Sequence, residues 1–191
     1  VFAQQGFASL RIDFLGSGES EGKWEDTCNS GQISDALVAI EYACNLPDID
    51  KDRMAVLGFS QGGLVAACSA SRESKIKSAI LWSPVAYPPL SGFYVLGKEA
   101  VEKGIQDENA LISATLPWGP TIQLKGKYFQ DLFRIDPVAE ISRYRGALLV
   151  VVGLKDNVVV PQPLAGKIYL EYHSGEHSLV ALDADHVFNC F

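Results

Sequence analysis

Short apolar runs alternate with helical patterns along most of the chain. The runs are rich in β-branched and aromatic residues and are bounded by turn-forming residues, which is typical of strands in a covered sheet. They lie at residues 7–14, 53–58, 78–82, 147–153 and 178–182. Strands that alternate with helices favour a parallel sheet with helices packed against it, so the pattern predicts an α/β fold.

Helical periodicity appears between these runs. The first helix places Ile33, Leu37 and Ile40 on one face, and either Asn29 or Ser30 is available as its N-cap. Further helices are predicted at residues 61–71 and 163–169.

The alternation breaks between residues 84 and 137. Prolines, glycines and aromatic residues are scattered there among short helical patches. An insertion of this kind between core strands usually forms a lid over a site, although a surface excursion without a role is the alternative. The predicted organisation is a first part of an α/β core at residues 1–83, a lid at 84–137 and a second part of the core at 138–191.

Composition narrows the class of protein. The chain has 191 residues, 48% of them hydrophobic, which suits one domain with a real core. Its net charge of −7 disfavours binding to nucleic acid. No apolar run approaches the roughly 20 residues that span a bilayer, so no membrane partner is expected. A homodimer is left open.

The cysteines indicate a reducing compartment. They follow no CxxC pattern and no regular spacing, so they are predicted to be free thiols and the protein to be cytoplasmic. They are Cys28, Cys44, Cys68 and Cys190.

A glycine-rich turn carries the candidate nucleophile. Residues 58–62 read Gly-Phe-Ser-Gln-Gly and fit the G-x-S-x-G pattern between a predicted strand and a predicted helix. So abrupt a turn forces Ser60 into a strained backbone conformation and exposes its hydroxyl, and the flanking glycines avoid Cβ clashes. The helix N-terminus offers the N–H of Gln61 to an oxyanion. An ordinary Gly/Ser turn is the alternative.

A serine nucleophile needs a base, and histidine is the usual one because it titrates near neutrality. Of the three histidines, His186 follows the last predicted strand, where its side chain can reach the sheet edge that carries Ser60. His173 and His177 lie before that strand, at the opposite end of the sheet. Their spacing could suggest a metal pair, but no third ligand accompanies them, and both are predicted to be solvated turn residues.

Asp156 is the candidate acid that orients the base. It follows the most apolar of the predicted strands, and the carboxyl ends of parallel strands share one rim of a sheet. The chain order Ser60, Asp156, His186 is also the order expected after a G-x-S-x-G turn of this kind. Asp183 and Asp185 compete for the role, but adjacent loop residues point apart, so Asp185 ranks second.

Together these motifs resemble the α/β-hydrolase superfamily, and within it the bacterial cinnamoyl/feruloyl-type esterases with a lid inserted between core strands. The resemblance implies a three-layer α/β-hydrolase fold with a mostly parallel sheet, a triad of Ser60, Asp156 and His186, and Gln61 N–H as one oxyanion donor. Ser17 takes a position where the family often has His, so its loop is assigned a structural role. The likeness rests on residues 11–14, 16–22, 58–63, 153–161 and 183–186.

The same resemblance implies parts of the fold outside this sequence. N-terminal strands, a closing helix and the loop with the second oxyanion donor are expected before Val1 or after Phe191. A site with one donor instead of two would lose about 3 kcal/mol of transition-state stabilisation. We therefore expect these 191 residues alone to be a poor enzyme.

The aromatic residues of the predicted lid suggest the substrate. Such side chains can wall a pocket for an aryl or short acyl group, although more often they pack a lid onto its core. Trp118, between a proline and a glycine, and Tyr128 are the candidate substrate-binding residues. The aromatic residues are Tyr87, Phe93, Tyr94, Trp118, Tyr128, Phe129 and Phe133.

The favoured function is a carboxylesterase acting on small or hydroxycinnamate-type esters, with no metal or organic cofactor. A peptidase or thioesterase on the same scaffold is the alternative enzyme, because the triad does not choose the leaving group. A binding protein that keeps the fold without the chemistry is the second class of function.

Overall fold

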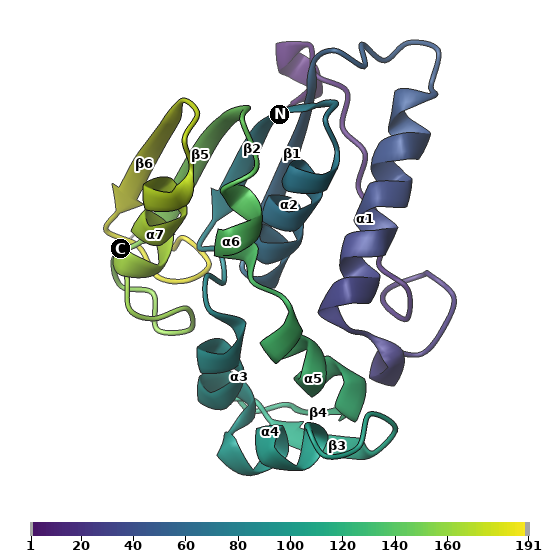
Figure 1. The fold of residues 1–191 in the computed structure, drawn as a ribbon, viewed down its shortest axis with the longest axis vertical. Helices are drawn as coiled ribbons and strands as arrows, with labels where there is room; N and C mark the ends of the chain where they lie inside the picture. Colours follow the sequence, from purple (N-terminus) through teal and green to yellow (C-terminus); the bar gives the residue numbers. More distant parts are fainter. Residues whose placement is uncertain (1, 190–191) are drawn as a thin grey trace.

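The computed structural model describes residues 2–189, and its centre is a parallel sheet. The sheet has four strands, and their order across it confirms a parallel α/β arrangement (Figure 1). The strands, in that order, are β1 (Met54–Phe59), β2 (Ile76–Trp82), β5 (Ala147–Gly153) and β6 (His177–Leu182). Each lies close to the residues predicted for it.

A row of helices covers one face of this sheet (Figure 1). Leu81, Val150 and Val152 are fully buried beneath it, together with Tyr169 from the last helix. The row consists of α1 (Asn29–Cys44), α2 (Gln61–Arg72), α6 (Pro137–Ile141) and α7 (Leu164–Tyr172).

Side chains on the other face of the sheet are more exposed because successive residues of a strand point to opposite faces. Leu57 is 41% exposed and Val180 is 40% exposed. No helix within residues 2–189 covers this face, so the described chain supplies two of the three predicted layers.

The strand predicted at residues 7–14 does not form. These residues are mostly exposed, and no strand of the described chain pairs with them. An apolar run becomes a strand only when a neighbouring strand accepts its backbone hydrogen bonds. Short 3-10 turns flank the segment, at Ala3–Gln5 and, after the glycine loop, at Trp24–Asp26.

The N-terminus of α1 is capped by a distant residue instead of the predicted Asn29 or Ser30. Asn29 is already the first helical residue, and Cys28 occupies the N-cap position without a side-chain hydrogen bond. The Ser30 N–H donates to Asp131 Oδ2 at 2.7 Å, from a helix of the inserted region. A buried carboxylate at a helix N-terminus accepts a hydrogen bond from an N–H that has no partner within the helix, and the positive end of the helix dipole attracts its negative charge.

The inserted region forms its own layer at one end of the molecule (Figure 1). Its apolar centre gathers around Val101, Leu124 and Phe129. Part of the region forms a β-hairpin, where only short helical patches were expected. Each strand of the hairpin is short and has few inward-facing apolar residues, so the sequence shows no clear alternation of apolar and polar positions. The elements are α3 (Pro88–Leu96), α4 (Lys98–Gly104), β3 (Leu111–Thr115), β4 (Thr121–Lys125) and α5 (Gly126–Arg134).

The junction between β1 and α2 consists of Ser60 alone, with φ 57° and ψ −120°. A Cβ at Gly58 would lie 1.9 Å from the Gly62 carbonyl oxygen, and one at Gly63 would lie 2.8 Å from Pro84 Cβ. A Cβ at Gly62 meets nothing within 4 Å. The turn therefore requires glycine before the serine, whereas the expectation that Gly62 is needed on steric grounds is wrong.

No helix among residues 2–189 combines the length and the apolar character needed to cross a bilayer. Cys28, Cys44 and Cys68 are free thiols, and Cys190 lies outside the described residues. Burial raises the pKa of Cys68 to about 12.

The two glycines around Ser60 should respond differently to alanine. We expect Gly58→Ala to lower the free energy of unfolding by about 1–3 kcal/mol or more, because the backbone of α2 must move. Gly62→Ala should be neutral or stabilising by up to about 1 kcal/mol, because alanine is the better helix former. Urea unfolding monitored by circular dichroism checks both, and equal losses would contradict this account of the turn.

Candidate active site

Three side chains that are far apart in sequence meet at the carboxyl end of the sheet. His186 Nε2 lies 3.0 Å from Ser60 Oγ, and His186 Nδ1 lies 2.8 Å from Asp156 Oδ2. A ring protonated on Nδ1 donates to the carboxylate and leaves Nε2 to accept the serine proton. The predicted Ser, His and Asp thus form a continuous chain of hydrogen bonds.

Asp156 is a buried acid whose contacts favour its charged form. Its side chain is 0% exposed, and Oδ1 accepts hydrogen bonds from the N–H groups of Val158 at 2.8 Å and Val159 at 2.9 Å. Burial acts to raise the pKa of Asp156, but the hydrogen bonds from His186 and from these amides together outweigh it, so the pKa is lowered. The group therefore stays a carboxylate that can stabilise an imidazolium.

The two competing acids are engaged elsewhere. Asp185 Oδ1 accepts from the N–H groups of Val187 and Asn189, which shapes the loop around His186. Asp183 pairs with Lys155 Nζ at 2.9 Å. Within residues 2–189, neither carboxylate is hydrogen-bonded to the His186 ring.

Phe59 is a neighbour of the base that the sequence pattern did not indicate. Its ring centroid lies 4.8 Å from that of His186, and the histidine side chain is only 12% exposed. The apolar ring restricts where the imidazole can turn, while part of the histidine side chain stays exposed.

The Gln61 N–H is suited to stabilise an oxyanion. Gln61 is the first residue of α2, and within residues 2–189 no carbonyl accepts a hydrogen bond from its backbone N–H. It lies next to Ser60 at the positive end of a helix, where negative charge is favoured.

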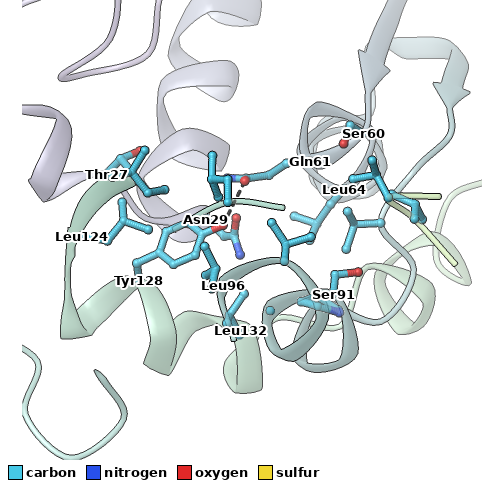
Figure 2. A pocket seen from close by; sticks show the side chains of 18 of the residues that line it. Thr27, Asn29, Ser60, Gln61, Leu64, Ser91, Leu96, Leu124, Tyr128 and Leu132 are labelled. Atoms are coloured by element: carbon cyan, nitrogen blue, oxygen red, sulfur yellow. Dashed lines mark hydrogen bonds between the residues drawn. The ribbon is translucent and has the colours of Figure 1, made fainter. Parts of the chain in front are cut away.

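Two cavities meet at Ser60. The inner cavity, of about 280 Å³, extends toward α1 and the inserted region (Figure 2). The outer cavity, of about 530 Å³, is lined by His186 and Asp185. Ser60 and Trp118 line both, so the serine hydroxyl lies where one meets the other.

Both predicted substrate-binding residues line these cavities. Trp118 lies in the turn between β3 and β4 and is 56% exposed. Tyr128 lies in α5, and its hydroxyl donates to Gln61 Oε1 at 3.0 Å. Burial raises the pKa of Tyr128 to about 12, with a smaller contribution from the Asp131 carboxylate.

Sequence reasoning missed the rest of this polar network. Gln61 Nε2 donates to Gln32 Oε1 at 2.9 Å, and Gln32 Nε2 donates to Thr27 Oγ1 at 3.1 Å. Gln32 and Thr27 are buried. No spacing in the sequence points to them, because Thr27, just before α1, and Gln32, in its first turns, reach the cavity only once the chain is folded.

The other aromatic residues of the inserted region divide between packing and the outer cavity. Phe129 is fully buried in the centre of that region, and Phe93 pairs with Phe133 with ring centroids 6.1 Å apart. Tyr94 lines the outer cavity, whereas Tyr87 is 63% exposed.

The prediction of a solvated turn is wrong for His173. This residue is 3% exposed, and its ring packs against Tyr144 and His177 at centroid distances of 5.6 and 5.7 Å. Burial is the main cause that lowers the pKa of His173, which favours the neutral ring. Because α7 packs on the sheet, the residue that follows its last turn faces inward. His177 is exposed, as predicted.

Among the described residues, no group of three or more His, Cys, Asp or Glu side chains could hold a metal ion.

Solved structures share this fold. The structure of Est1E from Butyrivibrio proteoclasticus with bound ferulic acid is 26% identical, with a TM-score of 0.77, and the match covers 93% of this chain and 68% of that one. Acetyl xylan esterase 1 from Thermoanaerobacterium sp. JW/SL YS485 is 19% identical, with a TM-score of 0.63, over 91% of this chain and 59% of that one, which shows the fold alone. The predicted α/β-hydrolase fold is confirmed.

Sequence relatives match a shorter part of the chain. The quorum-quenching protein AidA of Acinetobacter baumannii (strain MDR-ZJ06) is 31% identical over 84 residues, which are 44% of this chain and 28% of that protein. The family model described as the prolyl oligopeptidase family matches residues 1–168, a range that includes Ser60 and Asp156. The chain therefore belongs to the prolyl oligopeptidase family, within the α/β-hydrolase fold.

Proposed function

We propose that this protein is a serine carboxylesterase that forms an acyl-enzyme on Ser60 and acts on esters with small or aryl acyl groups, including hydroxycinnamate-type esters. The observation that carries this proposal is the chain of hydrogen bonds from Ser60 Oγ through the His186 ring to Asp156. A hydroxyl in contact with an imidazole that a buried carboxylate orients is equipped for nucleophilic attack on a carbonyl.

The reaction proceeds in two halves. Ser60 Oγ attacks the ester carbonyl carbon while His186 Nε2 takes the hydroxyl proton, and the resulting oxyanion accepts a hydrogen bond from the Gln61 N–H. The C–O bond to the alcohol then breaks, and His186 returns its proton to the leaving oxygen. Water repeats the sequence on the acyl-enzyme, which releases the acid and restores Ser60.

The two cavities correspond to the two sides of the ester. His186 must reach the leaving oxygen to protonate it, and His186 lines only the outer cavity. Gln61, the oxyanion donor, lines only the inner cavity. We therefore assign the alcohol to the outer cavity and the acyl group to the inner one, with Trp118 at the boundary.

The lining of the inner cavity favours a neutral acyl group. None of the described residues that line it carries a formal charge, and most of its wall is apolar. An ionised group placed there would lose its hydration without gaining a partner. The likeness to Est1E with bound ferulic acid supports an aryl acyl group.

A peptidase is the second candidate, because the matching family is named for prolyl oligopeptidase. The same triad would cleave an amide bond after proline if the inner cavity held the pyrrolidine ring. The uncharged cavity is compatible with that ring, so substrate profiling must separate the two activities.

The triad can be tested by covalent labelling and by kinetics. A fluorophosphonate probe should label the protein, and Ser60→Ala should abolish labelling. His186→Ala should lower kcat for p-nitrophenyl butyrate by at least about a thousandfold, and Asp156→Asn by about 10³–10⁴.

Matched controls use the same residue types away from the site. Ser71→Ala, His177→Ala and Asp183→Asn should keep labelling and kcat close to those of the wild type, because none of the three contacts the triad. Probe labelling that survives Ser60→Ala would overturn the proposal.

Acyl charge should decide which esters are cleaved. We expect p-nitrophenyl butyrate to be hydrolysed at least about tenfold more efficiently, as kcat/KM, than the p-nitrophenyl monoester of succinate, which has a similar size but an anionic end. A prolyl p-nitroanilide measured in parallel distinguishes the peptidase. Equal cleavage of the neutral and anionic esters would contradict the assignment of the acyl group to the inner cavity.

A further inference from the structure

The wall of the inner cavity contains a polar side chain without a hydrogen-bond partner. Asn29 lines this cavity and is 1% exposed. Its Oδ1 is buried without a partner, and the hydrogen bonds of the described residues include none to its side-chain amide. Leaving a buried amide unpaired costs free energy, so such a group calls for an explanation.

The neighbouring polar side chains in the cavity are already paired. Tyr128, Gln61, Gln32 and Thr27 form one chain of hydrogen bonds that ends without using the Asn29 amide. Asn29 does not cap its helix either, since Cys28 holds the N-cap position and the carboxylate that accepts from the first turn belongs to Asp131. The amide thus has no structural bond that would account for its presence.

The position of this amide suits the recognition of an acyl group. Ser60, Gln61 and Asn29 line one cavity, and Figure 2 shows the side chains of all three in its wall. Leu96, Leu124 and Leu132 line the same cavity. An acyl chain attached to Ser60 and directed into this cavity meets apolar walls and, among them, one free amide.

We propose that Asn29 determines acyl specificity by hydrogen bonding to a hydroxyl on the acyl group of the ester. This inference rests on the proposed esterase function and names its preferred substrates: esters of neutral acids with a hydroxyl on the acyl chain or ring. A hydroxyl both donates and accepts, so it satisfies either end of the amide, whose two ends exchange by a half-turn of the last side-chain bond. A charged group is excluded by the uncharged lining.

The test compares esters that differ only by a hydroxyl. The substrates are p-nitrophenyl 3-phenylpropanoate and its 3-hydroxyphenyl and 4-hydroxyphenyl analogues. The wild-type protein should cleave one hydroxylated ester with a kcat/KM about 5- to 100-fold higher than that of the unsubstituted ester. This is the range expected when the unsubstituted ester leaves a buried polar group without a hydrogen-bond partner. Asn29→Leu should reduce this preference to one or below, because the loss falls on kcat/KM for the hydroxylated ester.

A stability measurement separates recognition from a structural role. Leucine has nearly the shape of asparagine, and replacing an unpaired buried amide by an apolar group is neutral or stabilising. The melting temperature of Asn29→Leu should therefore be equal to or higher than that of the wild type. Asn45→Leu, at the exposed opposite end of α1, is the matched control and should leave the preference unchanged.

The failures of the two proposals differ. If no ester is cleaved and Ser60 is not labelled by the fluorophosphonate probe, the esterase function itself is wrong. If the esters are cleaved but without a hydroxyl preference, or the preference survives Asn29→Leu, the role of Asn29 is overturned. It is also overturned if Ser91→Ala, which removes a hydroxyl lining the same cavity, abolishes the preference instead, or if Asn29→Leu melts at a lower temperature.

Discussion

The site depends on a single backbone residue, Ser60, held at a positive φ between a strand and a helix. With φ at 57°, the serine backbone is in a conformation that residues other than glycine rarely adopt, and the surrounding structure must maintain it. Hydrogen bonds from Ser60 N–H to the Trp82 carbonyl and from Val85 N–H to the Ser60 carbonyl hold it there. The same turn places the Gln61 N–H, from which no carbonyl of residues 2–189 accepts a hydrogen bond, next to the hydroxyl, so one local conformation presents both groups.

Around this turn, the parallel sheet brings Asp156 and His186 to the rim that carries Ser60. Asp156 follows β5 and His186 follows β6, and neighbouring parallel strands end at the same edge. The acid is buried, yet three hydrogen bonds favour its charged form, so it orients the imidazole without competing for the serine proton. The position of the acid therefore follows from the sheet, and its charged form follows from two backbone amides and the imidazole.

The inserted region contributes more of the residues that line the inner cavity than the core does. It provides Tyr128, which bonds to Gln61, and Asp131, which bonds to the first turn of α1. Lys125 adds an ion pair with Asp26 at 2.6 Å. These contacts hold the insertion against the segment that contains Thr27, Asn29 and Gln32, and so a single polar network joins the nucleophile turn to both. The shape of the inner cavity is thus a product of the interface between insertion and core.

The amino-acid sequence by itself determined the features that have local causes. The strands β1, β2, β5 and β6, the strained turn at Ser60 and the choice of Asp156 and His186 follow from apolar runs, a glycine pattern and chain order, all of which act over a few residues or through a common sheet. Their catalytic roles stay predictions until they are tested.

Tertiary structure decided whatever needs a distant partner. Residues 7–14 form no strand because no described strand pairs with them, and Asp131 caps α1 from far along the chain. His173 is buried because α7 packs on the sheet, and Asn29 faces a cavity whose opposite wall belongs to the insertion. Hydrogen bonds and burial depend on neighbours in space, and a linear pattern encodes those neighbours only through the completed fold.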